Sequence, residues 1–136
     1  MNPAPYMLDT DICIAMIRGK GARVIAMLKS LPPGDALLSS VTAAELYCGV
    51  FKCAAPRRAM DALAIFMGPF EVASFGQEAA LAYGRIRAAL EKEGKVIGSM
   101  DMLIGAHALS WGATLVTHNT REFSRVKGLK LADWLL

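Results

Sequence analysis

The sequence has 136 residues, of which 54% are hydrophobic and 20% are charged, and its net charge is +3. This length fits one domain with one core, and the apolar segments are too interrupted for a membrane-spanning helix. The amino-terminal segment does not have the pattern of a secretory signal, so we expect a cytoplasmic protein. Cys13, Cys48 and Cys53 are odd in number, and we expect them to be reduced thiols in the core.

Apolar runs of strand length alternate along the chain with longer segments of helical period. The predicted strands are Tyr6–Asp9, Ala36–Ser39, Phe70–Ala73, Thr114–Thr117 and Leu129–Leu131. The predicted helices are Asp11–Arg18, Ala22–Leu31, Val41–Cys53, Arg57–Met67, Gln77–Glu93 and Met100–Trp111. The alternation predicts one α/β domain, residues 1–136, with a mostly parallel central sheet. Gly112 is expected to end its helix in the left-handed conformation.

Oxygen-bearing side chains follow the predicted strands or begin the next helices. Asp9 ends the first strand, and Asp101 lies in the first turn of a helix for which Ser99 is a plausible N-cap. Glu45 and Asn119 belong to segments with capping-box spacing, Thr42 to Glu45 and Asn119 to Glu122. Each side chain alone is explained by helix capping. Together they predict a pocket, because open α/β sheets bind ligands at the carboxyl edge.

Converging carboxylates would need a cation. Two like charges about 4 Å apart repel by roughly 4 kcal/mol at an effective dielectric constant of 20. Mg²⁺ and Mn²⁺ prefer oxygen ligands, and Mg²⁺ often bridges carboxylates and substrate phosphates. If Asp9, Glu45 and Asp101 converge, the sequence therefore favours metal-dependent phosphodiester chemistry. Apart from these three acids, Lys and Arg outnumber Asp and Glu in the chain, so a polyanionic partner is allowed.

Four segments carry a resemblance to a known family. They are MLDTDI at 7–12, SVTAAEL at 40–46, IGSMDMLIGAHAL at 97–109 and LVTHNTREFSRVKGL at 115–129. In order and spacing the chain resembles the PIN-domain ribonucleases, and among them the VapC-type toxins of bacterial toxin–antitoxin pairs. The resemblance implies a three-layer α/β/α fold and an endoribonuclease, a hydrolase that depends on Mg²⁺ or Mn²⁺.

The resemblance also assigns site residues. It implies that Asp9, Glu45 and Asp101 bind the metal, and that Asn119 stands where many members have a fourth Asp. In the implied mechanism, Asn119 orients a water molecule or the phosphate. Asp11 stands where Asn is common, as an outer group of the site or a first-turn helix acid. Gly105 stands where Ala is common, with an expected effect on packing alone.

The last segment is most similar to the branch that cleaves initiator tRNA in the anticodon stem-loop. The candidate substrate contacts are Thr10, Thr117, His118, Arg121 and Arg125. The resemblance further implies a homodimer and a cognate VapB-type antitoxin whose carboxyl-terminal segment covers the active-site groove. The apolar residues of Val41–Cys53 and Arg57–Met67 suit that surface, or they are ordinary core.

Two other functions remain open at this stage. Asp9-Thr10-Asp11 after an apolar strand also suits a haloacid-dehalogenase-like phosphatase, although Asp101 has no acidic neighbour in sequence to complete its metal site. A degenerate PIN-like module that binds RNA or protein without cleavage is the other alternative. His107 follows Asp101 by six residues on the same predicted helix, so it is expected to point away from that acid.

Overall fold

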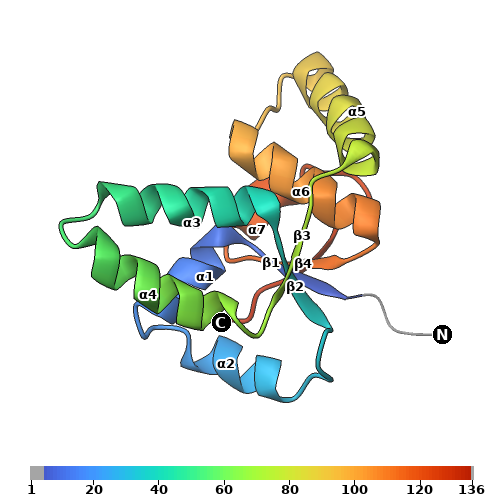
Figure 1. Cartoon of the computed structure of the whole chain (residues 1–136). Helices are drawn as coiled ribbons and strands as arrows, with labels where there is room; N and C mark the ends of the chain where they lie inside the picture. The colour runs from blue at the N-terminus through green and yellow to red at the C-terminus, as the bar shows by residue number, and fades with distance from the viewer. Residues whose placement is uncertain (1–4, 136) are drawn as a thin grey trace.

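Five short parallel strands form the centre of residues 5–135, the part of the chain that the computed structural model describes (Figure 1). The strands are β1 (Tyr6–Leu8), β2 (Ala36–Ser39), β3 (Glu71–Ala73), β4 (Thr114–Val116) and β5 (Lys130–Ala132). Their spatial order is β3-β2-β1-β4-β5. The prediction of a mostly parallel sheet is confirmed. Residues 1–4 and 136 of the predicted domain lie outside the described part.

Helices connect the strands. They are α1 (Thr10–Ile17), α2 (Ala22–Lys29), α3 (Ser40–Lys52), α4 (Pro56–Met67), α5 (Gln77–Glu93), α6 (Ser99–Trp111) and α7 (Thr120–Phe123). Gly112 ends α6 with a φ of 67°, as predicted. The single turn α7 is too short to show a helical period in the sequence. Among residues 5–135 we find no helix with the length and apolarity to cross a bilayer.

The two faces of the sheet are covered by different helices. Consecutive strand residues point to opposite faces, so Met7, Leu37 and Leu115 join one core and Leu8, Leu38 and Val116 the other. The first core contains residues of α5 and α6, and the second contains residues of α1, α2, α3 and α4. This arrangement confirms the predicted three-layer α/β/α fold.

The strand order creates a switch point between β1 and β4. From β1 the chain proceeds through β2 to β3 on one side, and then returns to place β4 and β5 on the other side. Because all strands are parallel, their carboxyl ends share one edge. Open α/β sheets bind ligands at this edge, in the crevice where the strand order reverses. The site is therefore expected where β1 and β4 end.

Two of the three cysteines are not in the core. Cys13 is buried, but Cys48 and Cys53 are exposed free thiols near the end of α3. The prediction of core thiols is therefore wrong for these two. Helix α3 extends with α4 beyond the sheet (Figure 1), so one side of its distal half meets solvent. On the same helix Val50 is buried while Phe51 is 70% exposed.

The predicted helix starts need correction. Helix α3 begins at Ser40, and Ser39 caps it by accepting the Val41 N–H at 3.0 Å. Thr42 to Glu45 is therefore not a capping box, and Glu45 lies in the second turn. Ser99 is the first residue of α6, and Gly98 occupies the N-cap position. Asn119 precedes α7, but its side chain makes no capping hydrogen bond.

Replacing Gly105 with Ala is expected to raise the free energy of unfolding by about 0.5–1 kcal/mol. Gly105 is buried inside α6, and a Cβ there would meet the Phe123 ring at 3.5 Å, an ordinary van der Waals distance. Denaturant unfolding measures the effect. The exposed helical glycine Gly84, where a Cβ meets nothing within 4 Å, gives the propensity gain without packing. A destabilised Gly105→Ala variant would show that the Phe123 ring cannot adjust.

Candidate active site

Asp9 occupies the switch point. It follows β1, and its backbone N–H donates to the Val116 carbonyl of β4 at 2.9 Å. As the N-cap of α1, its Oδ1 accepts the Thr10 N–H at 2.8 Å. Its Oδ2 accepts the Thr117 hydroxyl, also at 2.8 Å. The predicted capping role is confirmed, and two hydrogen bonds fix the carboxylate in a site where it is 2% exposed.

Burial makes the Asp9 carboxylate hard to ionise. Desolvation raises its pKa from the usual 3.8 to about 7, and the negative charges of Asp11 and Asp101 add to the rise. The hydrogen bonds from Thr117 and Thr10 act in the opposite direction without cancelling it. A strongly shifted acid at a ligand-binding edge is a mark of a functional site. A bound cation would favour its ionised form.

Thr10 connects Asp9 to Glu45. Its hydroxyl donates to Glu45 Oε1 at 2.7 Å, and it also lies 3.2 Å from the hydroxyl of Thr42. Since one hydroxyl carries one hydrogen, Thr42 donates to Thr10 while Thr10 donates to Glu45. Helix α1 and helix α3 are thus tied together at the site. Thr10, predicted as a substrate contact, thus orients the carboxylates of both Asp9 and Glu45.

Asp101 brings a third helix to the cluster. It lies in the first turn of α6 and is partly buried. Its pKa is raised, first by burial and then by the charges of Asp11, Glu45 and Glu122. Asp9, Asp11, Glu45, Asp101 and Glu122 therefore form one electrostatically coupled group, which we call the acid cluster. The structure thus brings the three predicted acids into one region.

The sequence interpretation missed Glu122 as a site residue. Its position three residues after Asn119 pointed to a capping box, which the structure does not contain. The Glu122 carboxylate instead lies near enough to Asp101 to raise its pKa, and 3.8 Å from an Arg125 nitrogen. A one-turn helix gave no periodicity that could place this side chain.

The acid cluster has the donor chemistry of a hard divalent cation. All of its donors are carboxylate oxygens, which Mg²⁺ and Mn²⁺ prefer. No three His, Cys, Asp or Glu side chains among residues 5–135 converge closely enough to hold one ion by themselves. Mg²⁺ usually keeps several water ligands, so a shell completed by water fits this arrangement.

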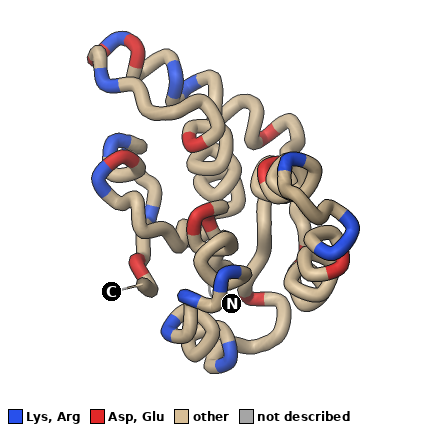
Figure 2. Tube along the Cα trace, turned by 90° about the vertical axis from the view of Figure 1, so that its left-hand side faces the viewer, with Lys and Arg blue, Asp and Glu red and all other residues tan. Residues whose placement is uncertain are grey.

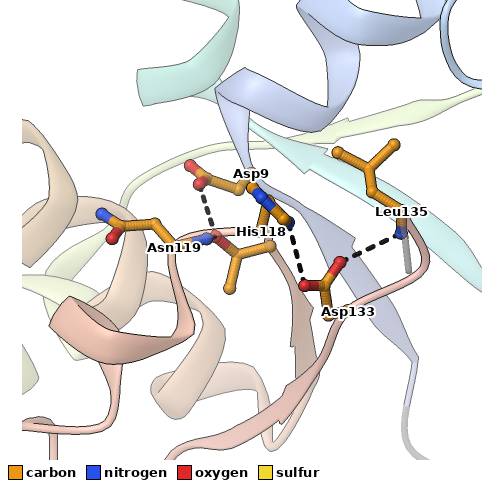
Figure 3. Close-up of polar contacts among 6 residues, drawn as sticks. Asp9, His118, Asn119, Asp133 and Leu135 are labelled. Atoms are coloured by element: carbon orange, nitrogen blue, oxygen red, sulfur yellow. Dashed lines mark hydrogen bonds and ion pairs between the residues drawn. The ribbon is translucent and has the colours of Figure 1, made fainter.

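Thr117 also holds the turn that carries Asn119. Its hydroxyl oxygen accepts the Asn119 backbone N–H at 3.0 Å while its hydrogen goes to Asp9. The Asn119 amide makes no hydrogen bond to the described residues and leaves the chain in a different direction from the neighbouring His118 ring (Figure 3). Thr117 is therefore fully engaged within the protein, whereas the Asn119 amide is available to a ligand.

The remaining candidate substrate contacts lie around the cluster. His118 pairs with Asp133, with 2.9 Å between Nδ1 and Oδ2. Arg121 and Arg125 are exposed, and Arg125 donates to the Val96 carbonyl at 3.2 Å. Lys and Arg lie mainly on outer helices and loops (Figure 2). Arg121 is thus the freer of the two arginines to meet an anionic ligand.

His107 is a packed histidine. It is 1% exposed, and its Nδ1 lies 2.7 Å from the Ser39 hydroxyl. The ring meets Phe75 edge-on, with 5.4 Å between ring centroids. Burial lowers the pKa of His107. It therefore supports the contact between α6 and the start of α3 and takes no part in the acid cluster.

Comparison with known families identifies the family to which this fold belongs. The model of the PIN domain matches residues 6–129 of the chain. The chain belongs to the PIN-domain family. This assignment confirms the resemblance found in the sequence and excludes the haloacid-dehalogenase-like alternative.

Individual PIN-domain relatives match over nearly their whole length. The chain is 41% identical to the tRNA(fMet)-specific endonuclease VapC of Shigella flexneri, over 95% of this chain and 97% of that protein. It is 37% identical to ribonuclease VapC2 of Rickettsia felis, with the same coverage. Among solved structures, DNA-bound VapBC of Salmonella typhimurium has a TM-score of 0.92 at 36% identity, covering 97% of this chain and 99% of that one.

Proposed function

We propose that this PIN-domain protein is a metal-dependent endoribonuclease of the VapC type, held inactive by a VapB-type antitoxin. The observation that carries the proposal is the acid cluster at the β1/β4 switch point, where buried Asp9 is joined by carboxylates from three other elements. The names of the relatives, ribonuclease VapC2 and tRNA(fMet)-specific endonuclease VapC, support the reaction class.

Asp9, Asp101 and Glu45 are the residues that would hold Mg²⁺ or Mn²⁺. When bound, the ion polarises a phosphoryl oxygen and makes water a better nucleophile. Thr10 and Thr117 keep the Asp9 carboxylate in one orientation, and Thr10 does the same for Glu45. The free amide of Asn119 orients the attacking water or the phosphate. Asp11 adds negative charge to the cluster.

The proposed substrate is RNA, with initiator tRNA as the first candidate because a relative is named for that specificity. Hydrolysis in the anticodon stem-loop would leave 5′-phosphate and 3′-hydroxyl ends. An RNA loop exposes unpaired bases and an irregular backbone. It therefore fits the open edge of the sheet better than a regular RNA duplex does.

A groove beside the acid cluster suits the proposed antitoxin segment. It encloses about 320 Å³ between α1, α3 and α4. Its lining includes Ile14, Ile17, Leu46, Val50 and Leu63, together with Glu45 at the site. An apolar peptide seated there would reach Glu45 and block the cluster. Solved relatives include VapBC complexes, which supports such a partner. We further propose a homodimer that acts in the cytoplasm.

Cleavage of total bacterial RNA by the purified protein tests the proposed function. We expect a discrete tRNA fragment with Mg²⁺ or Mn²⁺ and none with chelator. Sequencing the fragment ends gives the cut site. If the protein, freed of any antitoxin, cleaves no RNA with either metal, the non-catalytic binding module becomes the better assignment.

The double variant Arg121→Gln/Arg125→Gln is expected to show a weaker salt dependence of RNA binding than the wild-type protein. Each phosphate contact to a single strand contributes about 0.7 to the slope of log K against log salt, so two contacts contribute about 1.4. Binding is measured by fluorescence anisotropy between 50 and 200 mM salt without metal, a range of roughly fourfold. The matched control replaces Arg57 and Arg58, exposed at the start of α4. Equal slopes in both double variants would contradict the prediction.

A further inference from the structure

A histidine and an aspartate form a pair beside the acid cluster. His118 Nδ1 lies 2.9 Å from Oδ2 of Asp133, which follows β5 (Figure 3). The second oxygen of the carboxylate, Oδ1, accepts the Leu135 N–H at 3.0 Å. Rotation of the Asp133 side chain would break both hydrogen bonds. The two hydrogen bonds therefore fix the orientation of the carboxylate, and the carboxylate in turn holds the imidazole.

The segment that carries Asp133 is itself anchored. Trp134 is 8% exposed and packs against Tyr6 of β1, with 5.0 Å between ring centroids. Strand β5 pairs with β4, and the Thr117 N–H donates to the Ala132 carbonyl at 2.9 Å. His118 and Asp133 thus leave two paired strands at the same edge of the sheet as Asp9.

The two side chains differ in exposure. The Asp133 side chain is 11% exposed, whereas the His118 side chain is 61% exposed. An ionised carboxylate only accepts hydrogen bonds, so we assign the hydrogen of this contact to His118 Nδ1. Nε2 is then the ring nitrogen left for a partner outside the protein. A contact between a carboxylate and a side chain this exposed contributes little to stability, so the fold alone does not explain why the ring is fixed.

We propose that His118 contacts the RNA backbone next to the scissile phosphate through Nε2, and that Asp133 is the positioning residue for its ring. This inference rests on the proposed function. His118 follows Thr117, whose hydroxyl holds Asp9, and precedes Asn119. An RNA backbone that extends from a phosphate at Asp9 along this edge of the sheet would cross the end of β4, where the imidazole is held against Asp133. A ring fixed by a carboxylate binds with less loss of side-chain entropy than a free one.

Steady-state cleavage of a labelled RNA that contains the mapped cut site tests the contact. His118→Asn keeps a donor near the Nδ1 position for Asp133 but has no atom at Nε2. We expect it to raise KM by about 10-fold with kcat changed by less than about 3-fold, as for loss of uniform binding. His118→Gln places an amide nitrogen near Nε2 and should recover part of the loss. Single 2′-deoxy substitutions show whether the partner is a 2′-hydroxyl or a phosphate oxygen.

Asp133→Asn tests the positioning role. It should raise KM by about 3-fold when His118 is present and have no effect in the His118→Asn background, because the two residues act through one ring. The control is Asp35→Asn, at the opposite edge of the sheet next to β2, which should change neither constant. Thermal unfolding of each variant separates these effects from loss of folded protein.

An unchanged KM in His118→Asn would overturn the contact. A full Asp133→Asn effect in the absence of the imidazole would overturn the positioning role. If the wild-type protein cleaves RNA and the variants match it, this inference alone fails. If the wild-type protein cleaves no RNA with metal, the proposed function fails and the inference fails with it.

Discussion

Replacing Asp101 with Asn is expected to lower the rate of RNA cleavage by at least about 100-fold. The side chain keeps its shape but loses the charge that lies within range of Asp11, Glu45 and Glu122. Removing one carboxylate from a site built to hold a divalent cation removes several kcal/mol of transition-state stabilisation. RNA binding in chelator should be equal or tighter, because one negative charge no longer repels the phosphates. Single-turnover cleavage and anisotropy measure the two quantities separately.

The matched control for this variant is Glu78→Gln. Glu78 lies in the first turn of α5 as Asp101 lies in the first turn of α6, so both acids interact with a helix dipole. That interaction is worth about 0.3–1 kcal/mol of stability at either position. If Asp101 were only a first-turn acid, the two variants would lose similar stability and neither would lose cleavage. Equal cleavage rates for Asp101→Asn and Glu78→Gln would therefore show that Asp101 has no role in cleavage.

The sequence predicted what depends on periodicity and on strand ends. The alternation of apolar runs with helical segments predicted the parallel sheet. A parallel sheet brings Asp9 and Thr117 to one edge. The prediction that Glu45 belongs to this edge also agrees with the structure, although its capping role was wrong. The N-cap of α3 is Ser39 and not Thr42, and this shift of three residues places Glu45 in the second turn instead of the first.

What the sequence did not predict depends on contacts between distant side chains. Glu122 lies in a one-turn helix, so no pattern indicated that it faces Asp101. His118 and Asp133 are 15 residues apart and meet only because β4 and β5 pair in one register. The exposure of Cys48 depends on how far α3 extends past the sheet, which helix periodicity does not determine.

The metal-free protein is expected to lose stability as the pH rises from about 4 to about 7, through ionisation of Asp9. The folded-state pKa of Asp9 is about 7, against 3.8 for the ordinary carboxyl. The folded protein therefore binds more protons than the unfolded chain between these values. The contribution of protonated Asp9 is complete below about pH 4 and is lost as the pH passes 7. The rise of the Asp9 pKa from 3.8 to about 7 corresponds to a loss of about 4 kcal/mol in the free energy of unfolding.

Asp9→Asn isolates this contribution from the other titrating groups. The amide oxygen can still accept the Thr10 N–H, so the cap of α1 is kept while the charge is removed. Denaturant unfolding of both proteins in chelator, from pH 4 to pH 8, should show the variant gaining stability relative to wild type as the pH rises. Parallel curves for the two proteins would mean that Asp9 ionises without cost in the folded state.

Mg²⁺ should reverse the loss in the wild-type protein. A cation that binds the folded protein stabilises it in proportion to RT ln(1 + [L]/Kd), and its affinity is greatest when Asp9 is ionised. The stabilisation by Mg²⁺ is therefore expected to be larger at pH 8 than at pH 5, and to be smaller at pH 8 in Asp9→Asn than in wild type. A Mg²⁺ effect that is equal at both pH values and unchanged in Asp9→Asn would place the cation away from Asp9. Burial of ionised Asp9 would then lower the stability of the fold, and Mg²⁺ binding would not compensate for this loss.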